Sequence, residues 1–214
     1  MSLTVNSKEY WDNLFTSGTW EGNRGRWQTT EFAKAQVRRM NLPRSFNGTI
    51  LDFGCGLGDG MPIYRAYFPN ARLIGLDISA DGIEICRKIY GGIAEFVVGT
   101  HETMPEVDAV IASNVIEHIE DDIGVVKALL SKAPLVYVTV PYDEQHPLLE
   151  VHVRSYDKRR FEGVAKHSLV VFACEGWSEP PKVRRRIWRK NLVRALRGRP
   201  RIHTNLQIMY RFSR

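Results

Sequence analysis

Four glycines and two acidic residues gather in one short stretch, residues 52–60, with the sequence Asp-Phe-Gly-Cys-Gly-Leu-Gly-Asp-Gly. An apolar run precedes this stretch and a helical pattern follows it, so the sequence predicts a tight turn between a strand and a helix. Glycine is required where the backbone turns with a positive φ and where a ligand lies against bare main chain. The stretch therefore indicates a nucleoside-binding turn.

The spacing of these glycines excludes two familiar phosphate-binding loops. The dinucleotide fingerprint requires glycine at its first, third and sixth positions. Counted from Gly54 the sixth position is Asp59, and counted from Gly56 it is Met61. No Gly-Lys-Ser/Thr follows, so the Walker loop does not fit either. Because Asp52 and Asp59 would repel a pyrophosphate, the turn favours a ligand with an ammonium or sulfonium group, such as an amino-acid nucleoside.

Two further polar groups follow apolar runs and complete this candidate site. Asp77 lies 25 residues after Asp52, where a carboxylate at a strand end can accept hydrogen bonds from both hydroxyls of a ribose. Residues 113–118, Ser-Asn-Val-Ile-Glu-His, close another run. Open α/β folds bind ligands at the carboxyl edge of the sheet, so we expect these groups to lie at that edge.

The elements that position these residues alternate along the chain. Apolar runs cover residues 49–53, 72–77, 94–98, 108–112 and 135–140, and helical patterns cover 58–68, 80–90 and 119–132. Near-continuous apolar strands indicate a parallel sheet between two layers of helices. Outside this region we expect helices over 9–15, 30–40 and 156–164, a loop over 17–27, strands over 169–174 and 205–212, and a basic segment over 182–199.

The 214 residues contain no internal repeat and no linker long enough to separate two domains. We therefore expect one domain, with an N-terminal helical lid (1–47), a cofactor-binding core (48–142) and a C-terminal substrate-side region (143–214). No apolar run approaches the roughly 18–20 residues that span a membrane, and no signal peptide is recognisable. Three cysteines without CxxC spacing favour a reducing, cytoplasmic location over a disulfide framework or a zinc site.

Five sequence blocks together resemble the class I S-adenosylmethionine-dependent methyltransferases of the small-molecule type. The blocks are LDFGCGLG (51–58), GLDIS (75–79), EFVVG (95–99), DAVIASNVIEHI (108–119) and VYVTVP (136–141), with a fainter continuation in HVRSYD (152–157). The resemblance covers roughly residues 48–142. It implies an α/β fold with a doubly wound, mostly parallel, seven-stranded Rossmann-like sheet, whose last strand is antiparallel and whose two faces carry helices.

The resemblance also implies S-adenosyl-L-methionine as cofactor and assigns residues to it. Its methionine part would lie along Asp52, Gly54, Gly56 and Gly58, its ribose and adenine would lie at Asp77 and Ile78, and Asn114 and Val115 would lie beneath it. Many members have an acidic residue after the glycine that ends the third strand. Here Gly99 is followed by Thr100 and His101, and Thr100, His101 or Glu102 would contact the adenine in its place.

The motifs that the chain lacks exclude several classes of methyl acceptor. There is no Asp/Asn-Pro-Pro-Tyr after the fourth strand, no Pro-Cys pair, and no cluster of acids for a magnesium ion, so we expect no metal. What remains is an O or N atom of a small molecule, such as a sugar, lipid or secondary-metabolite precursor. The residues expected to surround it are Tyr10, Trp11, Trp20, Arg26 and Trp27 in an aromatic lid and Tyr142 after the fifth strand. The candidate bases are His118, His146 and His152, which the sequence does not separate.

The positive charge of the chain belongs to its end. Residues 182–214 carry 12 Lys and Arg and no acid, whereas the preceding residues carry 18 against 24 acids. Within 182–199, apolar residues recur at helical spacing with basic residues between them, which predicts a basic amphipathic helix. This helix either covers the core with a solvated cationic face or contacts an anionic surface, such as a membrane, a carrier phosphate or RNA. The alternatives to a small-molecule enzyme are an RNA methyltransferase and an RNA- or membrane-binding module.

Overall fold

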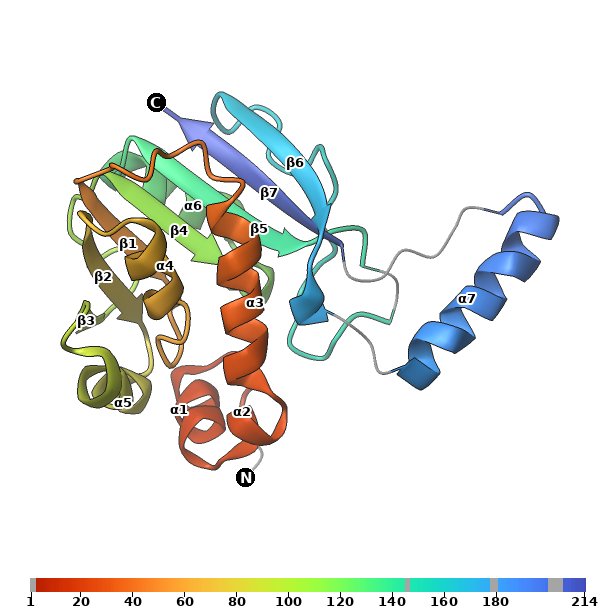
Figure 1. Ribbon diagram of the computed structural model, residues 1–214, viewed down its shortest axis with the longest axis horizontal. Helices are drawn as coiled ribbons and strands as arrows, with labels where there is room; N and C mark the ends of the chain where they lie inside the picture. Colours follow the sequence, from red (N-terminus) through yellow and green to blue (C-terminus); the bar gives the residue numbers. More distant parts are fainter. Residues whose placement is uncertain (1–2, 145–146, 178–180, 200–205) are drawn as a thin grey trace.

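The computed structural model describes residues 3–144, 147–177, 181–199 and 206–214, and it contains one seven-stranded sheet (Figure 1). The strand order is β3-β2-β1-β4-β5-β7-β6. The strands are β1 (Thr49–Phe53), β2 (Arg72–Asp77), β3 (Glu95–Val98), β4 (Ala109–Ser113), β5 (Leu135–Pro141), β6 (His167–Ala173) and β7 (Leu206–Ser213). The pairs among β1 to β5 are parallel, and β7 is antiparallel to both β5 and β6. The predicted fold class, including the reversed last strand, is confirmed.

Helices cover both faces of this sheet because its strands are apolar on both sides. On one face, α3 (Gly25–Val37), α4 (Met61–Tyr67) and α5 (Ala80–Tyr90) pack against side chains such as Ile50, Leu73 and Ile111. On the other face, α6 (Asp122–Lys132) and the segment 156–165 pack against Leu51, Val110 and their neighbours. Burial of these apolar faces is what holds the helices on the sheet.

Two N-terminal helices, α1 (Lys8–Thr16) and α2 (Thr19–Gly22), lie at the end of the sheet toward which β1 and β2 point (Figure 1). The order of the strands reverses at β1, because β1 pairs with β2 on one side and with β4 on the other. Open α/β sheets bind ligands at this reversal, outside the carboxyl ends of the strands. The fold therefore leaves its ligand-binding edge under α1 and α2.

The helix expected over residues 156–164 is wrong, because this segment consists of turns. The carboxylate of Asp122 accepts hydrogen bonds from the Tyr156 hydroxyl at 3.0 Å and from Nε of Arg160 at 2.9 Å. Asp157 accepts from the Arg159 backbone N–H at 2.8 Å, and Gly163 has φ +80°. These local bonds and the left-handed glycine replace helical hydrogen bonds.

Residues 17–27, expected as a loop, hold α2 and the first turn of α3. Helix α3 begins at Gly25, five residues earlier than the expected start at Thr30, directly after Arg24 with φ +64°. The guanidinium of Arg24 lies 4.0 Å from the centre of the Trp27 ring, a cation–π contact that favours this conformation.

The basic amphipathic helix is present as α7 (Pro181–Leu196), but it stands apart from the sheet (Figure 1). Its described apolar side chains include Trp188, Leu192 and Leu196, with exposed fractions of 61%, 48% and 88%. The prediction that this helix covers the core is therefore wrong for these residues. None of the described helices is both long and apolar enough to cross a membrane.

Candidate active site

The glycine turn after β1 adopts the conformation that its sequence requires. Gly54 has φ +71° and Gly56 has φ +54°, values in the left-handed region. The Gly54 N–H donates to the Leu76 carbonyl at 2.8 Å, which fixes the turn against the end of β2. A Cβ atom on Gly54 would lie 2.4 Å from Cγ2 of Val115, so only glycine fits there. The bare backbone of the turn after β1 thus meets the residues that follow β4.

The Asp77 carboxylate joins this turn to the end of β2. Its Oδ2 accepts from the Gly56 N–H at 2.9 Å, and its Oδ1 accepts from the Ser79 N–H at 2.9 Å. Burial raises the pKa of Asp77 to about 6, although the N–H donors of Ser79 and Gly56 favour the charged form. A carboxylate oxygen has two acceptor sites, so each oxygen can accept a second hydrogen bond from a ligand.

The Asp52 carboxyl has a different environment. It is 5% exposed, and no hydrogen bond to its side chain occurs among the described residues. Burial, together with the negative charge of Asp77, raises the pKa of Asp52 to about 8. A buried carboxylate without a donor is unfavourable unless a cation approaches it, so this site suits a positively charged ligand group.

Beneath the turn, Asn114 directly follows β4 and has φ +53°. Its N–H donates to the Thr139 carbonyl at 2.8 Å, and its Oδ1 accepts from Nε2 of Gln207 at 2.7 Å. Asparagine tolerates this left-handed conformation better than most residues. The bonds hold Asn114 so that Val115 packs against Gly54.

A single cavity of about 480 Å³ connects the turn with the N-terminal helices. Its turn side is lined by Asp52, Gly54, Gly56, Asp77, Ile78, Asn114 and Val115. Its other side is lined mainly by Tyr10, Trp11, Leu14, Phe15, Trp20, Gln28, Phe32, His118, Leu149 and His152. The rings of Trp11 and Phe15 are stacked at 6.0 Å, and Phe15 meets Trp20 edge-on at 5.3 Å. These rings form an apolar wall of the cavity, and Phe15 lies beside the glycine turn, with its Cζ 3.5 Å from a Cβ added to Gly56.

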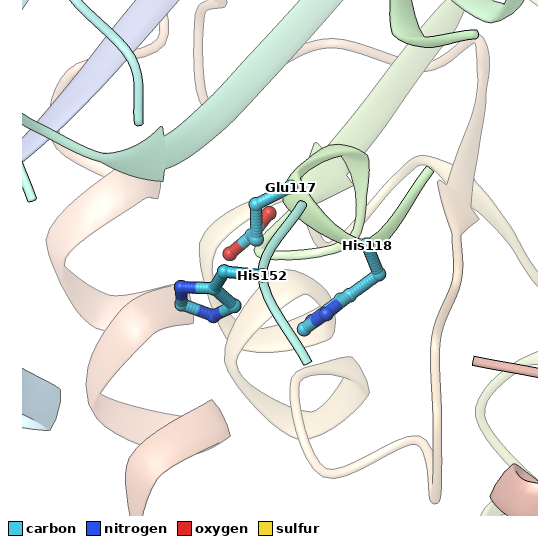
Figure 2. A group of neighbouring side chains, drawn as sticks. All are labelled: Glu117, His118 and His152. Atoms are coloured by element: carbon cyan, nitrogen blue, oxygen red, sulfur yellow. The ribbon is translucent and has the colours of Figure 1, made fainter. Parts of the chain in front are cut away.

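A polar cluster lies in the wall of the same cavity. The short 3-10 helix η1 (Ile116–His118) supplies Glu117 and His118, and the loop after β5 supplies His152 (Figure 2). Nδ1 of His118 lies 2.9 Å from the Val151 carbonyl oxygen, and Nδ1 of His152 lies 2.5 Å from Oε2 of Glu144. Burial lowers the pKa of His118 to about 4 and raises the pKa of Glu117 to about 7. His118 is therefore neutral at pH 7.

Residues 50–132 match the family model described as "Methyltransferase domain". This part of the chain is a methyltransferase domain. Comparison of the sequence with curated proteins gives no match.

Solved structures share the fold of this methyltransferase domain at low sequence identity. A chain of the complex between the Haloferax volcanii Trm112 methyltransferase activator and a methyltransferase is 17% identical, covers 99% of both chains and has a TM-score of 0.68. The plantazolicin methyltransferase BpumL, solved with a pentazolic desmethylPZN analog and SAH, is 18% identical, covers 97% of this chain and 96% of its own, and has a TM-score of 0.59. The YcgJ protein of Bacillus subtilis is 14% identical, covers 85% and 97%, and has a TM-score of 0.54.

The cavity of the methyltransferase domain fits the parts of S-adenosylmethionine. The buried carboxyl of Asp52, which lacks a protein donor among the described residues, suits a cationic group. Asp77 keeps acceptor capacity at the end of β2 for ribose hydroxyls. The left-handed glycines leave bare backbone between these two carboxyls. These features agree with the cofactor that the family requires.

The structure brings most of the expected site residues together at this cavity. The lining includes Asp52, Gly54, Gly56, Asp77, Ile78, Asn114 and Val115 from the cofactor set, Tyr10, Trp11 and Trp20 from the lid, and His118 and His152 from the base candidates. Seven expected residues lie outside the lining: Gly58, Thr100, His101, Glu102, Arg26, Trp27 and Tyr142. His146 lies outside the described residues.

Contacts with other parts of the protein account for the positions of three of these residues. Gly58 faces Phe96 and Tyr90 rather than the cavity, and Tyr142 packs against the core. Arg26 pairs with Asp59, with Nε 3.4 Å from Oδ1. The cavity is reached instead by Gly99, one residue before the expected Thr100.

Sequence reasoning missed Glu117 and Glu144 as site residues. Glu117 precedes His118 directly, so the adjacent acid and imidazole at a strand end were a usable signal. Glu144 lies eight residues before His152, and only the fold of that loop brings its carboxylate to Nδ1.

We expect Asp52→Asn to stabilise the ligand-free protein at pH 8 and to have little effect near pH 4. The folded-state pKa of Asp52, about 8, lies above the usual value for an unfolded chain, about 3.9. Ionisation therefore destabilises the fold progressively as pH rises between those values, by up to about 1.4 kcal/mol per pH unit, and asparagine removes this effect.

Urea denaturation at pH 5, 6, 7 and 8 measures this difference between Asp52→Asn and the unmutated protein. Asp81→Asn, at an exposed position in the first turn of α5, is the control and should show no such slope. A stability difference that stays constant from pH 5 to pH 8 would contradict the assignment.

Proposed function

We propose that this protein transfers the methyl group of S-adenosylmethionine to an oxygen or nitrogen atom of a small molecule held against the aromatic wall of the cavity. One observation carries the proposal: a single cavity joins the acidic glycine turn to that wall. When bound, S-adenosylmethionine supplies a methyl group on a sulfonium, which is already activated for displacement. The protein then has to orient the two reactants and exclude water.

In this proposal the turn side of the cavity holds the cofactor. Asp52 faces its cationic part, because the carboxylate is buried and has no hydrogen-bond donor among the described residues. Asp77 accepts from the ribose hydroxyls while its bonds to the Gly56 and Ser79 N–H groups hold it in place. The close contact of Gly54 with Val115 sets the depth of the site.

The aromatic wall of the cavity holds the acceptor. Trp11 lies between Tyr10 and Phe15, and its ring centre is 5.1 Å from that of His118. Aromatic faces exclude water and stabilise a nearby cation, here the sulfonium. An apolar, partly covered wall of this kind suits a small acceptor better than an RNA groove, which needs basic residues along the phosphate backbone.

The acceptor class can be tested with the purified protein and S-adenosylmethionine labelled in its methyl group. A low-molecular-mass cell extract and total RNA are offered separately as acceptors, with Asp77→Ala as the inactive control. We expect label in the low-mass fraction alone. Label transferred only to RNA would overturn the small-molecule assignment and support the RNA alternative.

We propose a second role for α7, contact with an anionic lipid surface. The helix exposes Trp188, Leu192 and Leu196 and carries basic residues such as Arg189 and Lys190. An amphipathic helix with exposed apolar and basic side chains inserts its apolar face among headgroups while its cations meet the lipid charge.

We expect the protein to co-sediment with phosphatidylglycerol-containing vesicles at low salt, and expect Leu192→Glu to weaken this at least 10-fold. Ile89→Glu, at a similarly exposed position on α5, is the matched control and should bind like the unmutated protein. Equal binding by both variants would exclude α7 as the contact. Binding to RNA but not to vesicles would overturn the lipid assignment.

A further inference from the structure

Two imidazoles and one carboxylate converge in the cavity wall. Glu117, His118 and His152 each offer one ligand atom, and these atoms all lie within 4.8 Å of one another (Figure 2). Two imidazoles and a carboxylate are a common ligand set for divalent transition metals. We propose that these three side chains form a binding site for one divalent cation of the zinc type.

Both imidazoles are oriented as metal ligands usually are. Nδ1 of His118 lies 2.9 Å from the Val151 carbonyl oxygen, which can only accept a hydrogen bond, so this nitrogen carries the proton. Nδ1 of His152 lies 2.5 Å from the Glu144 carboxylate. Metal-binding histidines characteristically donate one N–H to a carbonyl or carboxylate, which directs the other nitrogen to the ion. The ligand atom that each ring would offer is therefore Nε2.

The buried carboxylate of Glu117 is a second, independent observation in favour of a bound cation. Glu117 is 1% exposed, and its Oε1 accepts from Nδ2 of Asn114 at 3.1 Å. Among the described residues, no hydrogen-bond partner reaches its Oε2, which is buried. A buried carboxylate oxygen without a partner is costly, and coordination to a cation would satisfy it.

The ligand types and the local charge select the kind of ion. Imidazole nitrogens favour Zn²⁺, Co²⁺ or Fe²⁺, whereas Mg²⁺ and Ca²⁺ prefer oxygen ligands only. The carboxylates of Glu117 and Glu144 balance the charge of a divalent ion. Ligand atoms on one tetrahedral zinc ion lie about 3.4 Å apart, given bonds of about 2.1 Å, so binding draws the widest pair inward by up to about 1.4 Å.

An ion held by three protein ligands keeps a position open toward the cavity. This consequence rests on the proposed function: the open position would take an oxygen of the acceptor, which makes the acceptor a hydroxyl compound. The ion would lower the pKa of that hydroxyl, as it does for bound water, so the hydroxyl would lose its proton to solvent. Its oxygen would then take the methyl group as the bond from that group to the sulfonium sulfur breaks, leaving S-adenosylhomocysteine. His118 and His152 would then act as ligands in place of the role as bases expected from the sequence.

Titration of the full chain with Co²⁺, without S-adenosylmethionine, tests the site directly. We expect visible absorption bands of imidazole-bound cobalt that saturate at one equivalent and are displaced by Zn²⁺. Glu117→Gln and His152→Asn should each weaken binding at least 10-fold, and Glu144→Gln should weaken it less. His101→Asn, which removes a histidine outside the cavity lining, is the matched control and should bind like the unmutated protein.

A second measurement uses the unmutated protein, so that it does not depend on the folding of a variant. Zn²⁺ should shift the imidazole nitrogen resonances of two of the six histidines. No saturable Co²⁺ binding, shifts in other histidines only, or unchanged binding by Glu117→Gln and His152→Asn would each overturn the proposal. Because no methyl donor is present, these results are independent of whether the methyl-transfer proposal holds.

Discussion

Asp77→Ala should weaken the binding of S-adenosylmethionine and S-adenosylhomocysteine at least 100-fold. The substitution removes the carboxylate proposed to accept two ribose hydrogen bonds, and hydrogen bonds to a charged group contribute about 1.5–3 kcal/mol each. A loss of about 3 kcal/mol corresponds to roughly 100-fold in affinity. The substitution also removes the acceptor of the Gly56 N–H, so the glycine turn loses part of its support.

The thermal shift caused by S-adenosylhomocysteine measures this effect, because a ligand that binds only the folded state raises its melting temperature. Asp81→Ala, four residues later at an exposed position, should keep the full shift. The Asp77 assignment is lost if both variants show the same shift as the unmutated protein.

Gly54→Ala should destabilise the fold by about 2–5 kcal/mol. A left-handed backbone conformation costs a residue with a Cβ about 1–2 kcal/mol, and overpacking in a tight site costs about 1–3 kcal/mol more. Both apply here, because Gly54 has φ +71° and its added Cβ would lie 2.4 Å from Cγ2 of Val115. Cofactor binding should fall in parallel, since the turn shifts away from Asp77.

Gly163→Ala separates these two contributions in urea denaturation. Gly163 has φ +80° but no atom within 4 Å of an added Cβ, so it should lose only about 1–2 kcal/mol. Val115→Ala added to Gly54→Ala should restore part of the lost stability by making room. Equal losses at the two glycines would mean that the contact with Val115 has no effect on stability.

The central fold was predictable because its signals are local. Each strand from β1 to β5 is an apolar run. The turn between β1 and α4 requires glycine because its backbone has positive φ angles. Helix α5 was predicted with its observed bounds, because Ser79 caps its start by accepting from the Gly82 N–H. In these segments the local sequence and the tertiary packing favour the same conformation.

Elsewhere, contacts distant in sequence decide the structure. Residues 156–164 have a helical pattern, but Tyr156 and Arg160 bind Asp122, which lies more than thirty residues earlier. The apolar residues of α7 match a core-facing helix, yet the core is already covered by α3 to α6 and the segment 156–165. Periodicity indicates which face of a helix is apolar and does not say what covers it.

The candidate site was predictable where a residue ends a strand or directly follows one, as with Asp77 and Asn114. It was not predictable where a long loop returns to the sheet. Val151 meets His118 across 33 residues of sequence, and Glu144 meets His152 only through the path of the same loop. No periodic pattern marks such contacts, so the partners of His118 and His152 emerged only from the structure.

The most direct measurement of the central claim is calorimetric titration of the unmutated protein with S-adenosylmethionine and S-adenosylhomocysteine. The acidic glycine turn predicts saturable binding of both compounds at one site per chain. Saturable binding of NAD or ATP with no heat from either adenosyl compound would contradict it, because a pyrophosphate would then occupy a turn flanked by Asp52 and Asp59.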